Sequence, residues 1–139
     1  MKRLYLVALM LFVMLSFSCK KFIRQQEEKA ALNIITNGKW YVEQYVQNDS
    51  DITTSFSGYL FKFDANGIVT GANDSISSKG SWVPDVPSKT ISSIFPSASA
   101  PVSLLNGTWK IKDSYNDLVV ASYTDTTLKT SNALRLRKQ

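Results

Sequence analysis

Asn37-Gly38-Lys39-Trp40 contains a glycine–any–tryptophan pattern that the chain repeats at Gly80-Ser81-Trp82 and at Asn106-Gly107-Thr108-Trp109. The three copies hold all three tryptophans of the protein. A glycine lets the backbone turn or bulge, and residues two positions apart in a strand lie on the same face. The repeats therefore predict several antiparallel strands that begin at turns and place large rings in one shared interior.

The sequence around these repeats alternates between apolar and polar residues with the period of two that is typical of strands. In the first such segment, one face is expected to carry Trp40, Val42 and Val46, and the opposite face Tyr41, Glu43 and Tyr45. Asp64-Ala65-Asn66-Gly67 is typical of a hairpin turn between two strands. Eight strands are expected in all, over residues 39–47, 57–63, 67–72, 79–83, 90–95, 108–112, 118–123 and 133–137.

Residues 21–36 are the one segment for which the sequence predicts a helix. They include good helix formers such as Gln25, Gln26 and Ala30, and Asn37-Gly38 supplies a stop signal. The spacing of the strands that follow indicates an all-β sandwich or barrel. Eight strands suffice to close a barrel whose interior holds side chains or one small ligand.

The four prolines of the protein all fall between Pro84 and Pro101, together with several serines. Because proline is confined to strand edges and favours loops, this segment predicts a long loop around the short strand at 90–95. The loop is either a lid near the mouth of the barrel or a tolerated excursion, and the sequence leaves both readings open.

This arrangement resembles the lipocalin group, and in particular the small lipocalin-like lipoproteins of Gram-negative bacteria, which are small calycin-type barrels. The resemblance lies in the three glycine–any–tryptophan repeats and in the hairpin from Tyr59 to Gly67, and it covers residues 37–137. It implies an all-β fold, an eight-stranded antiparallel up-and-down (lipocalin-like) barrel preceded by one short α-helix.

The resemblance also implies roles for particular side chains. In lipocalins the tryptophan of the first strand packs at the closed end of the barrel, under an arginine from near the end of the chain. Trp40 matches that tryptophan, and Arg135 or Arg137 matches the arginine, as structural residues that close the barrel. The side chains expected to line the interior and any ligand are Trp40, Phe61, Phe63, Trp82 and Trp109. The chain is shorter than typical lipocalins and lacks their disulfide, so these rings leave less room for a ligand.

The first residues of the chain are typical of an export signal. Lys2 and Arg3 precede an apolar run from Leu4 to Phe17, which is shorter than the roughly 17–25 residues that a membrane-spanning helix needs. Leu15-Ser16-Phe17-Ser18-Cys19 resembles the lipobox of bacterial lipoproteins, although Ser16 stands where an aliphatic residue is usual. In such proteins the cysteine receives a diacylglycerol and becomes the first residue of the mature chain.

Cys19 is the only cysteine, so it cannot form an internal disulfide, and its position favours lipidation. Ordinary signal cleavage after Ser18 is the alternative. The predicted divisions are a lipoprotein signal peptide at 1–18, a lipidated N-terminus and tether helix at 19–36, and a lipocalin-like barrel at 37–139. Several acyl chains on Cys19 would hold the exported protein on the outer membrane. Because Lys20 and Lys21 follow the cysteine, we expect the protein to lie on the periplasmic face of the outer membrane rather than at the cell surface.

The sequence carries little that is typical of an enzyme. It has no histidine, and an acylated Cys19 offers no thiol, which removes the usual general base, nucleophile and soft metal ligands. The aspartates fall in stretches typical of turns, where they cap the local backbone. The aspartates in turn-like stretches are Asp49, Asp51, Asp64, Asp74, Asp113 and Asp117. We therefore expect a non-enzyme with no catalytic residue, no metal and no cofactor.

Two functions are compatible with these features. In the first, the anchored barrel binds a small apolar or amphipathic ligand. In the second, it has no internal ligand and docks an envelope protein through an outer face with Tyr41, Glu43 and Tyr45. Nucleic acid is not an expected partner, because the basic residues cluster at the two ends of the chain instead of forming a stripe. Removal of Lys2 and Arg3 also lowers the formal net charge from +5 to +3.

Overall fold

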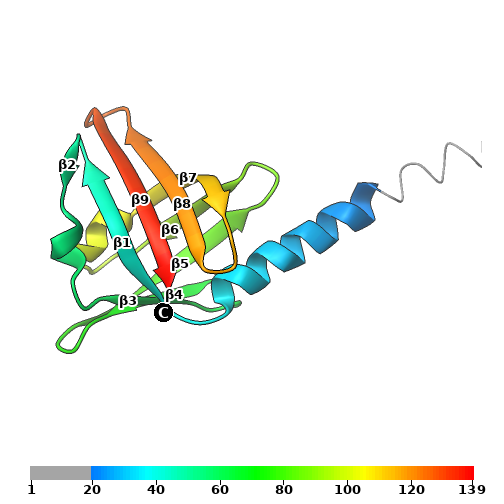
Figure 1. Ribbon diagram of the computed structural model, residues 1–139, viewed down its shortest axis with the longest axis horizontal. Coiled ribbons are helices and arrows are strands. Elements are labelled where there is room, and N and C mark those ends of the chain that lie inside the picture. Colours follow the sequence, from blue (N-terminus) through cyan, green and yellow to red (C-terminus); the bar gives the residue numbers. More distant parts are fainter. Residues whose placement is uncertain (1–19) are drawn as a thin grey trace, which may run out of the picture. The chain divides into compact units, whose positions relative to one another are not determined.

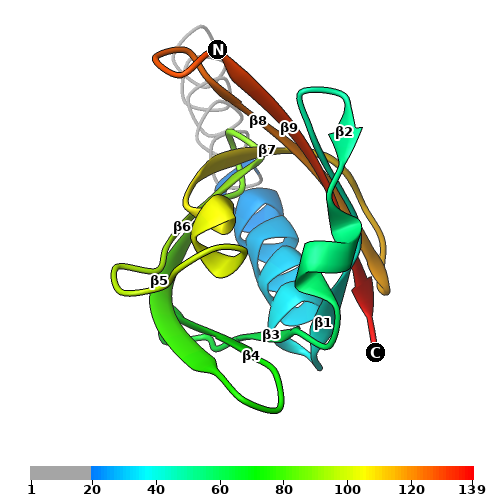
Figure 2. The same cartoon turned by 90° about the vertical axis from the view of Figure 1, so that its left-hand side faces the viewer.

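The computed structural model describes residues 20–139, so the predicted signal peptide and the lipidation site at Cys19 lie outside the described residues. The fold is a closed antiparallel barrel of eight strands preceded by a helix, as predicted (Figure 1). The barrel strands are β1 (Trp40–Gln47), β3 (Leu60–Phe63), β4 (Ile68–Ala72), β5 (Ser77–Asp85), β6 (Thr90–Ile94), β7 (Gly107–Ser114), β8 (Leu118–Asp125) and β9 (Thr130–Lys138). Each pairs with the next barrel strand, and β9 pairs with β1 to close the ring (Figure 2).

Each of the eight predicted strands corresponds to one of these elements. Three short elements were not predicted: β2 (Ser50–Asp51), the 3-10 helix η1 (Thr53–Phe56) and the 3-10 helix η2 (Val102–Leu105). All three are too short to leave a periodic signal in the sequence.

The seam between β1 and its neighbours is uneven. β1 pairs with β9 at seven positions along its length, but with β3 only where Trp40 lies opposite Phe61. Beyond that pair, β2 and η1 take the place of β3. The Ile52 amide donates to the Tyr45 carbonyl at 2.9 Å, and the Tyr45 amide donates to the Thr53 hydroxyl at 2.9 Å. The backbone of β1 is thus satisfied on both sides although one neighbouring strand is short.

A β-bulge between Val42 and Gln44 changes which side chains of β1 face the interior. The extra residue, Glu43, shifts the alternation by one position, so Tyr45 follows Val42 on the inner face. Tyr45 is fully buried. The sequence-based prediction that Tyr45 shares an outer face with Tyr41 and Glu43 is therefore wrong.

The helix extends through residue 36, where the sequence predicts its end. Its last turn belongs to the same compact unit as the barrel, Leu32–Gln139, with Ile35 buried in the core. Gly38 then turns the chain into β1 with a φ of 94°, a conformation that other residues rarely adopt. We call the end of the barrel that holds this turn the helix-side end. Among the described residues, no helix is long and apolar enough to span a bilayer.

The opposite end of the barrel carries η1 and η2 (Figure 2), and we call it the η end. Part of the proline-rich segment lies here, but it is not the long loop that the sequence predicts. Pro84 lies inside β5, β6 follows, and residues 95–105 then fold over the end of the barrel. Phe95, Val102 and Leu105 of that segment are buried in the core. Residues 95–105 are therefore a packed plug, neither a free lid nor a surface excursion.

Candidate functional site

The interior of the barrel is filled by side chains. The five rings expected to line it all lie in one continuous buried core: Trp40, Phe61, Phe63, Trp82 and Trp109. Neighbouring rings pack edge to face, with centroids 5.3 Å apart for Phe63 and Trp82 and 5.9 Å apart for Tyr45 and Trp109. Each indole N–H donates to a backbone carbonyl at 2.9 Å: Trp40 to Ile35, Trp82 to Asp64 and Trp109 to Leu105.

The space left between these side chains is small. A cavity of about 40 Å³ lies between Ile35 at the helix-side end and Leu105 at the η end, and Phe61, Phe63 and Trp109 line it. Ligand pockets usually measure about 300–1,000 Å³, and an engineered cavity that takes benzene measures about 150 Å³. This cavity among the described residues is too small for a drug-sized molecule, so a ligand there would require side chains to move.

The buried polar groups of the interior gather at the η end. The Tyr45 hydroxyl donates to the Leu104 carbonyl at 3.0 Å and lies 3.4 Å from Asn132 Oδ1, which also accepts from the Gln47 side chain at 3.1 Å. Burial, with a smaller contribution from the charge of Tyr123, raises the pKa of Tyr45 to about 12. Tyr45 therefore stays protonated at neutral pH and acts as a hydrogen-bond donor that ties the plug to β1.

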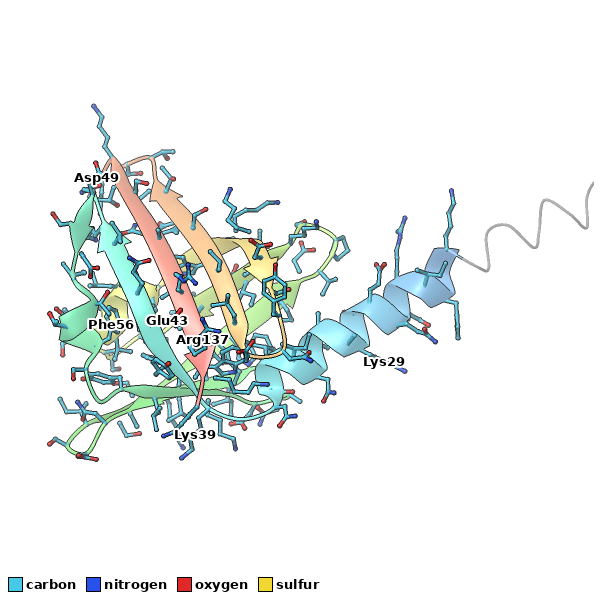
Figure 3. All side chains as sticks on the ribbon, in the orientation of Figure 1. Lys29, Lys39, Glu43, Asp49, Phe56 and Arg137 are labelled. Carbon is cyan, nitrogen blue, oxygen red and sulfur yellow. The ribbon has the colours of Figure 1, made fainter. Side chains whose placement is uncertain are left out.

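The cation above the first-strand ring is not one of the arginines implied by the family resemblance. Lys138 Nζ lies 5.0 Å from the centroid of the Trp40 ring. Arg135 and Arg137 instead donate to Glu43 on the outer wall of the barrel. Figure 3 shows Glu43 and Arg137 on the neighbouring strands β1 and β9. The role expected for the arginines at Trp40 thus belongs to Lys138, because the β1–β9 register pairs residue 138, and neither arginine, with Trp40.

Glu43 is the bulged residue of β1, and its carboxylate bridges two positions of β9. Arg135 Nε lies 3.2 Å from one carboxylate oxygen and Arg137 Nε 3.0 Å from the other, while Arg137 also reaches Asp117 at 3.1 Å. The hydrogen bond from Arg137 is the main cause that holds the pKa of Glu43 below its usual value. Because these side chains are partly exposed to solvent, the ion pairs orient β1 and β9 at the seam and add little to stability.

A shallow, open depression of about 350 Å³ lies beside this network, lined by Glu43, Gln44, Asp51, Thr53 and Arg135. Both carboxylates already accept hydrogen bonds, Glu43 from the two arginines and Asp51 from the Thr53 amide at 2.9 Å. Within residues 20–139, no three His, Cys, Asp or Glu side chains come together as a metal site would require. The predicted turn aspartates are spread over four turns: Asp49 and Asp51 at the β1–β2 hairpin, Asp64 after β3, Asp74 between β4 and β5, and Asp113 and Asp117 at the β7–β8 hairpin.

The outer wall over β4, β5, β6 and β7 has a different character. Ile68 lies opposite Ser81, Ser81 opposite Ile94, Val83 opposite Ser92, and Ser92 opposite Thr108, so these positions are neighbours on the outer surface. We call this set the uncharged face: Ile68, Ser81, Val83, Ser92, Ile94 and Thr108. Its aliphatic side chains are exposed, Ile68 by 40%, Val83 by 63% and Ile94 by 57%. The sequence alone did not predict this face, because its residues become neighbours only when four strands pair in their observed register.

The outer wall on the other side of the barrel differs from the uncharged face because it carries ion pairs. Over β8, β9 and β1 the outer surface carries the paired charges of Asp117, Arg137, Glu43 and Arg135. On the uncharged face, the polar members are hydroxyls, and Ser92 and Thr108 hydrogen-bond to each other at 2.8 Å. Lys79, Asp85 and Lys110 are exposed on the same strands and border this uncharged centre. An exposed apolar patch with a polar rim is a candidate contact surface for another macromolecule.

A solved structure resembles this barrel. A DUF4847 family protein from Bacteroides vulgatus ATCC 8482, whose crystal structure was determined at 1.00 Å resolution, matches with a TM-score of 0.56 and 16% sequence identity. The match covers 78% of this chain and 99% of that protein. At this identity the likeness shows the fold alone, a closed eight-stranded antiparallel barrel. No protein-family model matches the sequence, and no curated protein matches it either.

Proposed function

We propose that the protein is a non-catalytic, lipid-anchored module of the bacterial envelope that binds another protein through the uncharged face. The observation that carries this proposal is the exposure of Ile68, Val83 and Ile94 on one wall of a barrel whose interior is filled. The centres of protein interfaces are depleted in charge and enriched in apolar side chains. The face therefore fits a partner whose own contact surface is apolar and uncharged.

The anchor is the second part of the proposal. Cys19 stands at the end of an export signal and is the only thiol of the chain. Two or more acyl chains at this residue would keep the barrel on the outer membrane, on its periplasmic face, where envelope proteins are available as partners. Intact mass measurement of the mature protein tests this part. An N-terminal cysteine with added acyl mass supports it, and an unmodified cysteine contradicts it.

Crosslinking in cells followed by affinity purification tests the docking face. Val83→Lys and Ile94→Lys place a charge on the face, whereas Leu128→Lys and Ile76→Lys place one on exposed aliphatic residues in turns at the η end. We expect a partner that copurifies with the wild-type protein to be retained with the two control variants and reduced severalfold with the two face variants. Thermal unfolding of all four variants checks that each remains folded.

Two outcomes would contradict docking through this face. In the first, the face variants recover the partner as well as the control variants do. In the second, no protein is crosslinked at a stoichiometric level to the wild-type barrel.

Binding of a small apolar ligand inside the barrel is the second candidate function, and one observation favours it. The cavity of about 40 Å³ is lined almost wholly by apolar side chains, and at the η end only short elements cover the core, namely η1 with Phe56 and the plug with Val102 and Leu105. Native mass spectrometry of the protein from its own cells distinguishes the candidates. A bound small molecule of matching stoichiometry favours the ligand, and a bound protein favours docking.

A further inference from the structure

The first turns of the described helix combine exposed apolar and cationic side chains. Phe22 is 62% exposed and Ile23 54% exposed, and the sequence around them is Lys20-Lys21-Phe22-Ile23-Arg24. Exposed aromatic and aliphatic side chains among lysines and arginines are the composition of segments that lie at the surface of an anionic membrane. Neither the docking face nor the barrel interior accounts for this segment.

The helical geometry places the apolar side chains on one side. With about 100° between successive residues, Phe22, Ile23, Gln26 and Ala30 fall within a sector of about 100°. Lys29 borders this sector on one side and Lys20 on the other, with Glu27 between Ile23 and Lys20, while Glu28 lies on the opposite side of the helix. Residues 20–31 carry four cations and two glutamates, a formal net charge of +2.

We propose that this helix face, which we call the foot, inserts Phe22 and Ile23 into the interfacial region of an anionic lipid bilayer. The bordering lysines are long enough to extend their ammonium groups to lipid phosphates while their stems follow the apolar surface. The foot begins one residue after Cys19, so it lies where an acylated cysteine would meet the bilayer. The inference rests on the proposed anchor and adds a contact that depends on lipid charge.

The test uses the mature protein purified from its own cells and placed on vesicles. An acylated Cys19 leaves no thiol in the chain, so one added cysteine takes one fluorescent label. Gln26→Cys places the label on the foot, and Glu28→Cys places it on the opposite side of the same helix. The vesicles contain phosphatidylglycerol and phosphatidylethanolamine, with bromine atoms on the acyl chains as a quencher.

We expect quenching at position 26 to exceed quenching at position 28 severalfold. Phe22→Ser together with Ile23→Ser, added to Gln26→Cys, should reduce quenching to the level at position 28. Replacing phosphatidylglycerol by phosphatidylcholine should also reduce it. Equal quenching at positions 26 and 28, or quenching that survives the double serine variant, would overturn the foot. Quenching that is insensitive to lipid charge would overturn the role of the lysines.

The anchor and the foot fail in distinguishable ways. If the wild-type protein itself takes the label, Cys19 is not acylated and the proposed anchor fails. The same quenching comparison is then made with Cys19→Ser in every variant and soluble protein added to vesicles. Greater quenching at position 26 than at position 28 still supports the foot, and equal quenching or no binding to the vesicles overturns it.

Discussion

Lys138 covers the ring of Trp40 across the β1–β9 seam, with its Nζ 5.0 Å from the ring centroid. The same ammonium group donates to the Ile34 carbonyl at 3.3 Å, in the last turn of the helix. One side chain from the end of the chain thus contacts the first-strand tryptophan and satisfies a helix carbonyl that has no partner within the helix.

Removal of the Lys138 charge should measurably destabilise the barrel. Lys138→Met keeps the apolar stem, and we expect it to lower the free energy of unfolding by about 1 kcal/mol, the size of a cation–π contact. Lys79→Met, at an exposed position of β5, is the control and should change it by less than about 0.5 kcal/mol. Urea unfolding followed by tryptophan fluorescence measures both. Equal effects of the two substitutions would show that the contact with Trp40 contributes nothing.

The glycine of the second glycine–any–tryptophan repeat is expected to resist substitution. A Cβ at Gly80 would collide with the Ile94 carbonyl and approach the Phe95 ring to 2.9 Å. Because backbone of the paired strand cannot give way as a flexible side chain can, we expect Gly80→Ala to cost about 2–3 kcal/mol. Gly58 has open space around it and a φ of 79°, so Gly58→Ala should cost only the backbone strain, about 1 kcal/mol. Thermal unfolding of both variants makes the comparison, and the reverse order would contradict the collision at Gly80.

The network around Glu43 predicts a small loss of stability in acid. Its pKa in the folded state lies below the ordinary glutamate value of 4.5, so ionised Glu43 stabilises the fold above pH 4.5, and the contribution is lost as the pH falls through the folded-state pKa. The side chains of the ion pairs are partly exposed to solvent, and we therefore expect an effect under about 1 kcal/mol. Urea midpoints at pH 7 and pH 3 should differ less for Glu43→Gln than for the wild-type protein. An unchanged difference would mean that other carboxylates cause the acid sensitivity.

We expect the barrel to lose stability at alkaline pH because of Tyr45. Its folded-state pKa is raised from 10.0 to about 12, so its contribution is complete below pH 10 and is lost as the pH rises toward 12. A shift of this size corresponds to about 2–3 kcal/mol. Tyr45→Phe should cost about 1 kcal/mol at pH 7, through the lost bond to the Leu104 carbonyl, and should be less sensitive to alkali than the wild-type protein. The variant has to lose its alkaline sensitivity relative to Tyr41→Phe, the exposed control, for the assignment to stand.

The eight strands could be predicted from sequence because their signals are local. Alternation within each segment and glycines at the turns define strands one at a time, and the Asp64 to Gly67 turn joins two of them in the predicted place. Burial of the three tryptophans follows from the same alternation. The helix up to residue 36 also follows, because its composition and its stop signal are adjacent in the sequence.

The features that the sequence did not predict depend on contacts between strands. The bulge that turns Tyr45 inward depends on the register of β1 against β9, which no single segment reveals. The sequence did not predict the plug, because prolines indicate a loop whether or not that loop packs against the core. Only the burial of the Phe95 and Val102 side chains shows that this loop is packed. The exchange of the expected arginines for Lys138 is a difference of register of one or three residues.

Closure through β1 and β9 has a consequence for the order of assembly. A chain synthesised from its amino end produces β1 early, yet β1 finds most of its ladder partners only in the nine residues of β9, Thr130–Lys138. Until β9 is synthesised, the sheet has two edge strands with unpaired backbone groups. Such edges pair with the strands of other chains. A premature stop within β9 should therefore lead to aggregates rather than to a smaller barrel.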